Sequence, residues 1–392
     1  MRLIIKEFVR YLLYRFNRKS YIVRIKYNIC LDHVRKDSAS EYFFGYYDKS
    51  PEGNGKVLFH EMCEGQVKII IKDLESDKET IIANSMAYNW QLGTRAMWIT
   101  DEKVAYNDFD GERYVSRLYS LSDDKVLKTF DMPIQDYSEK GYFLGVNYQR
   151  LRSYAKEYGY YCLPELTDEE FDDYGHDGIW WIDAENGEYK LLLSIEEVIN
   201  CGKIERFEKG KHFVNHIMIS PSGESFIFIH RYYVGKERYD RLMYYDFKKL
   251  KCLFEDKLQS HYCWLDNTHV FGYGGYLGHN EFHTVDVNTG EVETCEELTA
   301  IHPKDGHPTK YGDWIVVDSY PYFSRMQELI AFNLKTKESR KILEVFHDMK
   351  HKGFDRCDLH PRFSKDGKRV YFDTLYTGKR ELCYVDVINV IK

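Results

Sequence analysis

The sequence has few of the features that mark disulfide-stapled, nucleotide-binding or nucleic-acid-binding proteins. Its nine cysteines form no CxxC pair and no even-numbered framework, which favours reduced, buried thiols in a cytoplasmic protein. The formal net charge of −8 argues against a dedicated nucleic-acid-binding protein. No GxGxxG follows a predicted strand, and neither GxxxxGK[ST] nor GxSxG occurs, so the common nucleotide and serine-nucleophile motifs are excluded.

The N-terminal segment also lacks the uninterrupted apolar run of a secretory signal or a membrane-spanning helix, because arginine and lysine recur through it. Residues 1–20 are predicted to form an amphipathic helix. Within it, residues 3–16 could lie on a membrane surface as a basic amphipathic helix. Packing of this helix on the rest of the domain is the favoured alternative, since surface helices normally carry such an apolar stripe.

Short strand-turn-strand units, in contrast, recur along the chain. The template is "RCDLHPRFSKDGKRVYFDTL", in which a polar cluster precedes an apolar hairpin with a Lys-Asp-Gly turn. Including the template there are seven copies, the other six being "NHIMISPSGESFIFIHR", "SHYCWLDNTHVFGYGG", "GHPTKYGDWIVVDSY", "GTRAMWITDEKVAYND", "IQDYSEKGYFLGVNY" and "YYDKSPEGNGKVLFHE". A third strand and an Asp turn follow each hairpin, as in "IIIKDLESDKE" and "FHTVDVNTGE". A repeat of roughly 40–50 residues with about four strands predicts an all-β fold, a seven-bladed β-propeller.

The propeller is predicted to span residues 21–392. Its last blade shows only three strands in the sequence, and the N-terminal "YIVRIKYNI" could supply the fourth and remove an exposed edge. The third blade carries an insertion, residues 149–178, that is long for a structureless loop and is therefore a candidate lid or sugar platform.

Polar residues recur at two positions of the repeat that should meet at one end of the central channel. The residue that opens the first strand is Arg95, His216, His261, His307 or His360 in five of the copies. The residues that close the second strand are His60, Asn107, Asp108, Asn147, His230, Arg231, Asp318 and Asp373. Histidine with aspartate suits a divalent ion such as Mn²⁺, Zn²⁺ or Ca²⁺, and an arginine fork suits a carboxylate. For Asp318 and Asp373 a structural role, in which the carboxylate joins adjacent blades through backbone amides, is at least as well favoured as a role in the site.

Several stretches resemble the seven-bladed propeller proteins related to oligogalacturonate lyases, in a branch associated with capsule and exopolysaccharide genes. They include "FFGYYDKSPEG", "NWQLGTRAMWI", "HFVNHIMISPSGESFIFIHR" and "RCDLHPRFSKDGKRVYFDTLYTGKRELCYVDV". The resemblance implies a Mn²⁺-like ion bound by three His and a Gln at the channel mouth. It also implies β-elimination of uronate-containing sugars.

Carried over to this sequence, the resemblance makes His307 and His360 metal ligands. Asp358 stands where the family has a histidine, and "FDRCD" offers no counterpart of the glutamine. His261 corresponds to the base, with His216 as the alternative base, and Arg231 to the arginine that faces the substrate carboxylate. The substrate-binding candidates at the same mouth are Gln91, Arg95, Asn107, Asn147, Arg150 and His230.

The sequence therefore predicts a cytoplasmic lyase that acts on uronate-containing oligosaccharides or polysaccharides with a divalent metal, most simply Mn²⁺. Two alternatives remain open. One is a non-catalytic propeller that binds a glycan or scaffolds polysaccharide assembly, since a fold does not determine a function. The other is a glycoside hydrolase that uses the same channel mouth.

Overall fold

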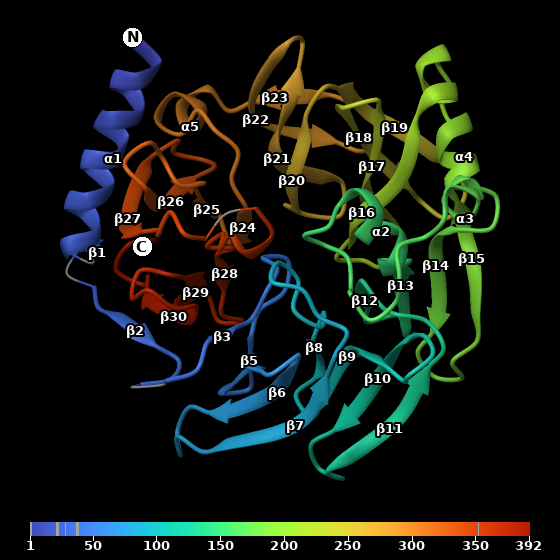
Figure 1. The fold of residues 1–392 in the computed structure, drawn as a ribbon, viewed down its shortest axis with the longest axis horizontal. Helices are drawn as coiled ribbons and strands as arrows, with labels where there is room; N and C mark the ends of the chain where they lie inside the picture. The colour runs from blue at the N-terminus through green and yellow to red at the C-terminus, as the bar shows by residue number, and fades with distance from the viewer. Residues whose placement is uncertain (1, 21–22, 28, 37–38, 352) are drawn as a thin grey trace.

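The computed structural model describes residues 2–20, 23–27, 29–36, 39–351 and 353–392. They form a ring of seven antiparallel sheets around one central axis, with a helix outside the ring (Figure 1). The predicted seven-bladed β-propeller is thus confirmed. In each blade the hairpins run outward from the axis in chain order, so the first strand of every blade lies innermost.

The first four blades follow the predicted repeat. Blade 1 contains β3 (Tyr42–Phe43), β4 (Glu52–Gly53), β5 (Lys56–Cys63), β6 (Gln66–Asp73) and β7 (Glu79–Ser85). Blade 2 contains β8 (Met97–Thr100), β9 (Lys103–Phe109), β10 (Tyr114–Ser120) and β11 (Lys125–Phe130). Blade 3 contains β12 (Asp136–Ser138), β13 (Tyr142–Val146), β14 (Gly178–Asp183) and β15 (Tyr189–Ser194). Blade 4 contains β16 (Lys211–Ile219), β17 (Phe226–Val234), β18 (Glu237–Tyr245) and β19 (Leu250–Asp256).

The last three blades complete the ring. Blade 5 contains β20 (Gln259–Trp264), β21 (His269–Tyr276), β22 (His279–Asp286) and β23 (Val292–Thr294). Blade 6 contains β24 (Pro308–Tyr311), β25 (Trp314–Asp318), β26 (Met326–Asn333) and β27 (Ser339–Phe346). Blade 7 contains β28 (Arg362–Phe363), β29 (Arg369–Thr374) and β30 (Glu381–Asp386).

An N-terminal strand does close the last blade, but it is not the segment predicted. β2 (Leu31–His33) pairs with β30, whereas β1 (Val23–Ile25) pairs with β27 and adds a fifth strand to blade 6. Residues 21–29 were predicted to close the last blade, but the strand that they contain, β1, covers the edge of the neighbouring blade 6. Both strands have only three residues, and the chain can serve two adjacent blades because it runs along the outer edge from one to the next.

The Asp turns that follow the third strands have a simple physical cause. In blade 3 the Oδ1 atom of Asp183 accepts hydrogen bonds from the backbone N–H groups of Glu185 and Asn186, both at 2.8 Å. Asp73, Asp246 and Asp286 make the same contacts in their own blades. Such Asx turns reverse the chain tightly and so set the spacing of the repeat.

Helices occupy only the connections and the N-terminus. They are α1 (Arg2–Ser20), α2 (Tyr148–Tyr154), α3 (Asp168–Asp172), α4 (Ile195–Asn200), α5 (Glu296–Ile301) and the 3₁₀ turns η1 (Glu205–Lys209) and η2 (Gly353–Asp355). The insertion after β13 thus contains two short helices, and α3 begins with a capping box of Thr167 and Glu170. Within the described part of the chain, no helix is long and apolar enough to cross a membrane.

Candidate functional site: a histidine cluster on the propeller axis

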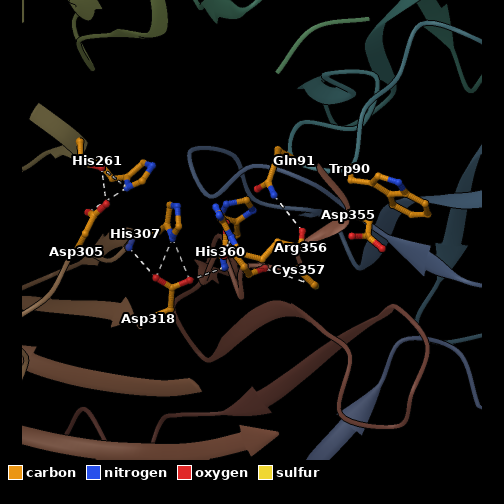
Figure 2. A network of polar contacts seen from close by, with 12 residues as sticks. Trp90, Gln91, His261, Asp305, His307, Asp318, Asp355, Arg356, Cys357 and His360 are labelled. Atoms are coloured by element: carbon orange, nitrogen blue, oxygen red, sulfur yellow. Dashed lines mark hydrogen bonds and ion pairs between the residues drawn. The ribbon is translucent and has the colours of Figure 1, made fainter. Parts of the chain in front are cut away.

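Four histidines from four successive blades meet near the axis. His216 lies in β16, His261 lies in β20, and His307 and His360 directly precede blades 6 and 7. The ring centroids of His261 and His307 are 3.9 Å apart, those of His307 and His360 are 4.3 Å apart, and those of His216 and His261 are 5.6 Å apart. The structure therefore brings together the four histidines that the repeat placed at equivalent positions. Figure 2 shows His261, His307 and His360 side by side.

The sequence led us to expect these histidines at an open channel mouth, but the cluster is buried. The four histidines are between 1% and 6% exposed. Tyr46 stacks on His216 with ring centroids 5.1 Å apart, and Tyr158 from the insertion meets the same ring edge-on at 4.8 Å. The insertion thus reaches the site with one aromatic side chain and helps to exclude water from it.

Each of the four imidazoles is held through its Nδ1 atom. The partner of His216 is the Tyr46 hydroxyl at 2.7 Å, and that of His261 is an Asp305 carboxylate oxygen at 3.2 Å. His307 contacts both Asp318 carboxylate oxygens at 2.9 and 3.1 Å. His360 contacts the Gly45 carbonyl oxygen at 2.8 Å. A carboxylate or carbonyl partner requires an N–H at Nδ1 and leaves the lone pair on Nε2. Figure 2 shows the Asp305 and Asp318 contacts.

The Nε2 atoms of His216, His261 and His360 are buried and have no hydrogen-bond partner among the described residues. A buried polar atom without a partner carries a desolvation cost of about 1–3 kcal/mol, so three in one cluster call for an explanation. Imidazoles oriented through Nδ1 with a free Nε2 are the usual arrangement of metal-binding histidines and of histidine general bases.

The backbone at this repeat position is also unusual. His216 and His360 have φ angles of 52° and 46°, and Arg95 of blade 2 has 53°. Left-handed conformations are costly for residues with a branched or bulky side chain, and they concentrate at functional sites. The strand carrying His216 contains a register shift between Asn215 and Met218, a β-bulge that turns the side chain toward the axis.

Glycine supports His360 from the first blade. Gly45 has a φ of 124°, and a Cβ atom there would lie 2.7 Å from the Leu92 carbonyl carbon. Only glycine can therefore bring this carbonyl oxygen to the His360 imidazole, and the Arg362 guanidinium donates to the same oxygen.

Burial keeps three of the imidazoles neutral. It lowers the pKa of His261 to about 4, and it lowers the pKa of His216 and of His360 well below the usual range. Burial acts in the same sense on His307, but the Asp318 carboxylate outweighs it and raises the pKa of that imidazole. Neutral imidazoles can bind a cation or accept a proton, whereas protonated ones cannot.

A possible metal centre lies at one end of the cluster. His307, Asp358 and His360 each offer a ligand atom, and these three atoms lie within 4.8 Å of one another. Ligand atoms around one divalent ion are separated by roughly 3–4.5 Å, so the arrangement is slightly wider than a closed site. The three side chains predicted as metal ligands thus lie together, at a spacing slightly wider than that around a bound ion.

Arg356 complicates this centre. Its guanidinium makes two 2.7 Å contacts with the two carboxylate oxygens of Asp358 and lies 4.8 Å from the Tyr320 ring centroid. Burial opposes ionisation of Asp358, but the Arg356 charge outweighs it and lowers the pKa of this carboxyl group. A cation at His307 and His360 would share Asp358 with a guanidinium.

Arg231 lies beside the cluster and remains charged. Its Nε atom is 3.2 Å from an Asp240 oxygen; burial lowers its pKa, but Asp240 outweighs burial and the pKa is raised. After burial, the charge of Arg231 is the largest influence that lowers the pKa of His216. The predicted arginine is thus close to the histidines and already has one carboxylate partner.

The substrate-binding candidates of blade 2 are mostly engaged elsewhere. The Arg95 guanidinium makes contacts of 2.9 and 2.8 Å with the Asp48 carboxylate, and its Cζ atom lies 6.0 Å from the Tyr46 ring centroid. The Asn107 side-chain amide donates to the Ile134 carbonyl oxygen and accepts from the Ile134 N–H. Gln91 donates to the Arg356 carbonyl oxygen at 3.0 Å, which places it at the edge of the site (Figure 2).

The three remaining candidates belong to other networks. Asn147 caps α2 and donates to Asp177, and Arg150 contacts the same Asp177 at 2.6 Å and secures the insertion. His230 bonds to His212 at 3.0 Å and to Arg241 at 3.3 Å within blade 4. These three side chains hold the structure around the site and are not brought into the cluster.

The carboxylates of Asp318 and Asp373 join adjacent blades through backbone N–H groups. This is the structural role weighed from the sequence as the alternative to a role in the site. Asp318 accepts from the backbone N–H groups of His307 and His360, at 2.7 and 2.9 Å. Asp373 accepts from the N–H groups of Phe44 and Gly45, at 3.0 and 3.1 Å. Asp318 also orients the His307 imidazole, so it serves both the fold and the site.

Sequence reasoning missed several residues of the site. They are Tyr46, Tyr158, Asp305, Tyr320 and Arg356. Asp305 precedes His307 by two residues in "KDGHP", and Arg356 precedes Asp358 by two in "RCD", so proximity in the chain could have indicated both. Tyr46 and Tyr158 come from other blades, and no spacing in the sequence connects them with the histidines.

No protein-family model and no curated protein sequence matches the chain. Its structure is similar to an oligogalacturonate lyase from Vibrio parahaemolyticus, with a TM-score of 0.63 and 15% identity over 95% of this chain and 99% of that one. An oligogalacturonate lyase in complex with manganese gives a TM-score of 0.60 and 15% identity over 93% of this chain and 98% of that one. The chain shares the fold of the oligogalacturonate lyases.

Other propellers match over less of their length. The tricorn protease gives a TM-score of 0.52 and 11% identity, over 89% of this chain but only 34% of that protein. At such identities the similarity establishes the architecture and leaves the activity to be argued from the site.

Proposed function

We propose that this protein is a lyase that cleaves uronate-containing glycans, such as capsular or extracellular polysaccharides or their oligosaccharides, by metal-assisted β-elimination. The observation that supports it is the cluster of four buried histidines held through Nδ1, three of them with a free Nε2. The fold shared with oligogalacturonate lyases, one of them a manganese complex, agrees with this chemistry.

The residues present fit a divalent ion. His307 and His360 would hold it through Nε2, and Asp358 would contribute a carboxylate oxygen beside Arg356. A carboxylate has about four lone-pair sites, so two contacts with a guanidinium do not exhaust it. Imidazole with carboxylate suits Mn²⁺ or Zn²⁺ better than Ca²⁺, which prefers oxygen ligands alone. When bound beside a uronate carboxylate, such an ion supplies positive charge where the enolate develops.

The proton transfer falls to His261. Asp305 accepts the Nδ1–H of its imidazole at 3.2 Å, which fixes the lone pair on Nε2 and stabilises the imidazolium formed when that atom takes the C5 proton. The electron pair of the C5–H bond becomes the C4–C5 double bond, and the C4–O bond breaks with its electrons on the leaving oxygen. Tyr158, which covers the cluster, must move for a sugar to reach this nitrogen.

Arg231 is assigned to the substrate carboxylate. Its planar fork can bind both carboxylate oxygens, and its charge favours the enolate over the ground state. The Asp240 carboxylate lies 3.2 Å from the Nε atom as an ion pair without a hydrogen bond, which leaves N–H groups of the guanidinium for a ligand.

A second candidate is a non-catalytic propeller that binds an acidic glycan. The Arg356–Asp358 pair favours it, because here a guanidinium already neutralises the carboxylate that would share in metal binding. In that case Arg231, Arg356 and Gln91 would contact the sugar carboxylates and hydroxyls, and no bond would be cleaved.

The deciding assay follows the ultraviolet absorbance of the C4–C5 unsaturated uronate, with uronate oligosaccharides and Mn²⁺. We expect the chromophore in the wild type, its suppression by a chelator, and a loss of at least about 100-fold in rate for His261→Gln with substrate binding retained. Arg231→Lys should lose most of the rate, because a point charge does not replace the fork. His279→Ala, at an exposed histidine of β22, is the matched control and should keep full activity.

Two results would overturn the lyase proposal. Cleavage that produces new reducing ends without the chromophore would identify a hydrolase. Tight glycan binding without any cleavage, with Mn²⁺ present, would establish the binding propeller.

A further inference from the structure

The N-terminal helix presents an apolar face to solvent instead of burying it. α1 contacts the propeller through Tyr14, whose ring packs on Phe346 with centroids 5.9 Å apart and whose hydroxyl donates to Asp348 at 3.0 Å. Together with Met326 these side chains form a small buried cluster. The helix lies along the outer edge of blade 6, beside β27 (Figure 1).

The opposite face carries the apolar stripe. Ile5, Phe8, Val9, Leu12 and Phe16 are 55%, 60%, 43%, 50% and 65% exposed. Their spacing of three, four, seven and eleven residues places them on one side of an α-helix. Tyr14 lies about half a turn away from Phe16 and Leu12, so docking on blade 6 and display of the stripe are compatible. The alternative weighed from the sequence, a helix packed on the domain, applies to Tyr14, whereas these five side chains of the stripe are exposed.

Charge is distributed unevenly between the helix and the rest of the chain. The helix has six basic residues and one acidic residue, whereas the whole protein has a formal net charge of −8. The described side chains of Lys6 and Arg15 are exposed at the two borders of the stripe. A helix with an apolar face bordered by lysine and arginine fits the interface of an anionic bilayer, where the basic groups reach the lipid headgroups.

We infer that α1 binds the protein peripherally to anionic lipid membranes, with Ile5, Phe8, Val9, Leu12 and Phe16 inserted at the headgroup boundary. The exposed stripe and its basic borders favour an anionic bilayer, because that one surface supplies both an apolar interior for the stripe and negative headgroups for the lysine and arginine side chains. Binding to a second copy of this protein is the alternative that the experiment below tests. The inference is independent of the proposed lyase activity.

Vesicle flotation tests it with the full-length chain. The protein should float with vesicles of phosphatidylcholine and phosphatidylglycerol, should bind pure phosphatidylcholine at least about tenfold more weakly, and should dissociate as salt is raised. Phe8→Ser with Leu12→Ser should lower binding to the anionic vesicles by at least about tenfold, because two insertion anchors are lost.

Matched controls separate insertion from general surface effects. Leu277→Ser with Met86→Ser removes two apolar side chains of the propeller that are 80% and 51% exposed, and it should leave binding unchanged. Lys6→Glu with Arg15→Glu should abolish the preference for anionic lipid, whereas Lys335→Glu with Lys365→Glu, the same charge change elsewhere, should not. Equal binding of the wild type and the Phe8/Leu12 variant would overturn the inference. So would a wild-type dimer in light scattering that the Phe8/Leu12 variant lacks, without vesicle binding.

Discussion

The two halves of the ring use the same repeat position in different ways. In blades 4 to 7 it carries His216, His261, His307 and His360, and three of their Nε2 atoms have no partner among the described residues. In blade 2 it carries Arg95, which shares the left-handed backbone of His216 and His360 but forms a two-contact ion pair with Asp48. His60, at the end of the second strand of blade 1, has its Nε2 atom 2.9 Å from the Thr94 hydroxyl.

The difference shows that convergence on the axis does not by itself make a reactive site. Repeat symmetry brings side chains from every blade to the axis, and hydrogen bonding then decides which of them remain free. In the first half the Arg95 guanidinium and the His60 Nε2 atom have partners, whereas the His60 Nδ1 atom is buried without one among the described residues. This half forms the wall of the site, and the cluster of unpaired Nε2 atoms lies in the other half. The second half retains unpaired nitrogen atoms at the expense of stability, as functional sites often do.

The largest expected effect compares Arg95 with His216. Arg95→Asn should lower the free energy of unfolding by about 3–5 kcal/mol, because it leaves the buried Asp48 carboxylate without its main partner. His216→Asn, with the same backbone conformation and the same new side chain, should cost only about 1–2 kcal/mol. Asparagine tolerates the left-handed region, so neither change adds backbone strain. Chemical denaturation measures both, and equal costs would remove the distinction between the halves.

Acid should act on both halves alike. Burial lowers the pKa of His60 and of His261 to about 4, from an ordinary value of 6.5. Between pH 6.5 and 4 the unfolded chain binds protons that the folded chain does not, so stability is complete above pH 6.5 and falls as the pH is lowered. One such histidine accounts for up to about 3 kcal/mol at pH 4.

The test is the slope of unfolding free energy against pH. His60→Gln should reduce that slope by one proton in this range, whatever it does to stability at pH 7. A slope identical to that of the wild type would mean that His60 is protonated in the folded protein as readily as in the unfolded chain.

A smaller effect concerns Arg356, whose guanidinium contacts Asp358 in the candidate metal centre. Arg356→Gln should strengthen Mn²⁺ binding by about tenfold, because it removes a positive charge that contacts both oxygens of Asp358. Arg340→Gln, which makes the same charge change at an exposed pair with Glu338, should leave the affinity unchanged. Calorimetric titration compares them, and weaker binding in the Arg356 variant would show that the guanidinium supports the site.

The architecture was predictable because it depends on turn residues and strand patterns that recur locally along the sequence. Turns such as that of Asp183 recur after the third strand in blades 1, 3, 4 and 5, with Asn333 in the same role in blade 6. This periodic signal makes the count of seven and the convergence of the four histidines predictable from the sequence. The closing strand was misplaced because residues 23–25 are more apolar than Leu-Asp-His at 31–33, so the sequence pattern favoured the wrong segment, and only the three-dimensional pairing identifies the strand that closes blade 7.

The environment of the histidines was less predictable. The sequence placed them at an exposed mouth, whereas Tyr46 and Tyr158 bury them, and those tyrosines come from a loop of blade 1 and from the insertion. Candidates such as Asn147 and Arg150 were chosen for their chemistry, but their partner Asp177 lies about 30 residues further along the chain and makes them structural. Contacts between distant loops leave no periodic signal.

The most direct test of the central claim is the metal content of the purified protein after equilibration with Mn²⁺. The account predicts one tightly bound divalent ion per chain in the wild type, and its loss in His307→Gln and in His360→Asn. His60→Gln in the other half of the ring and the exposed His279→Ala should both keep the ion. The absence of a stoichiometric ion in the wild type, or equal metal content in all four variants, would contradict it.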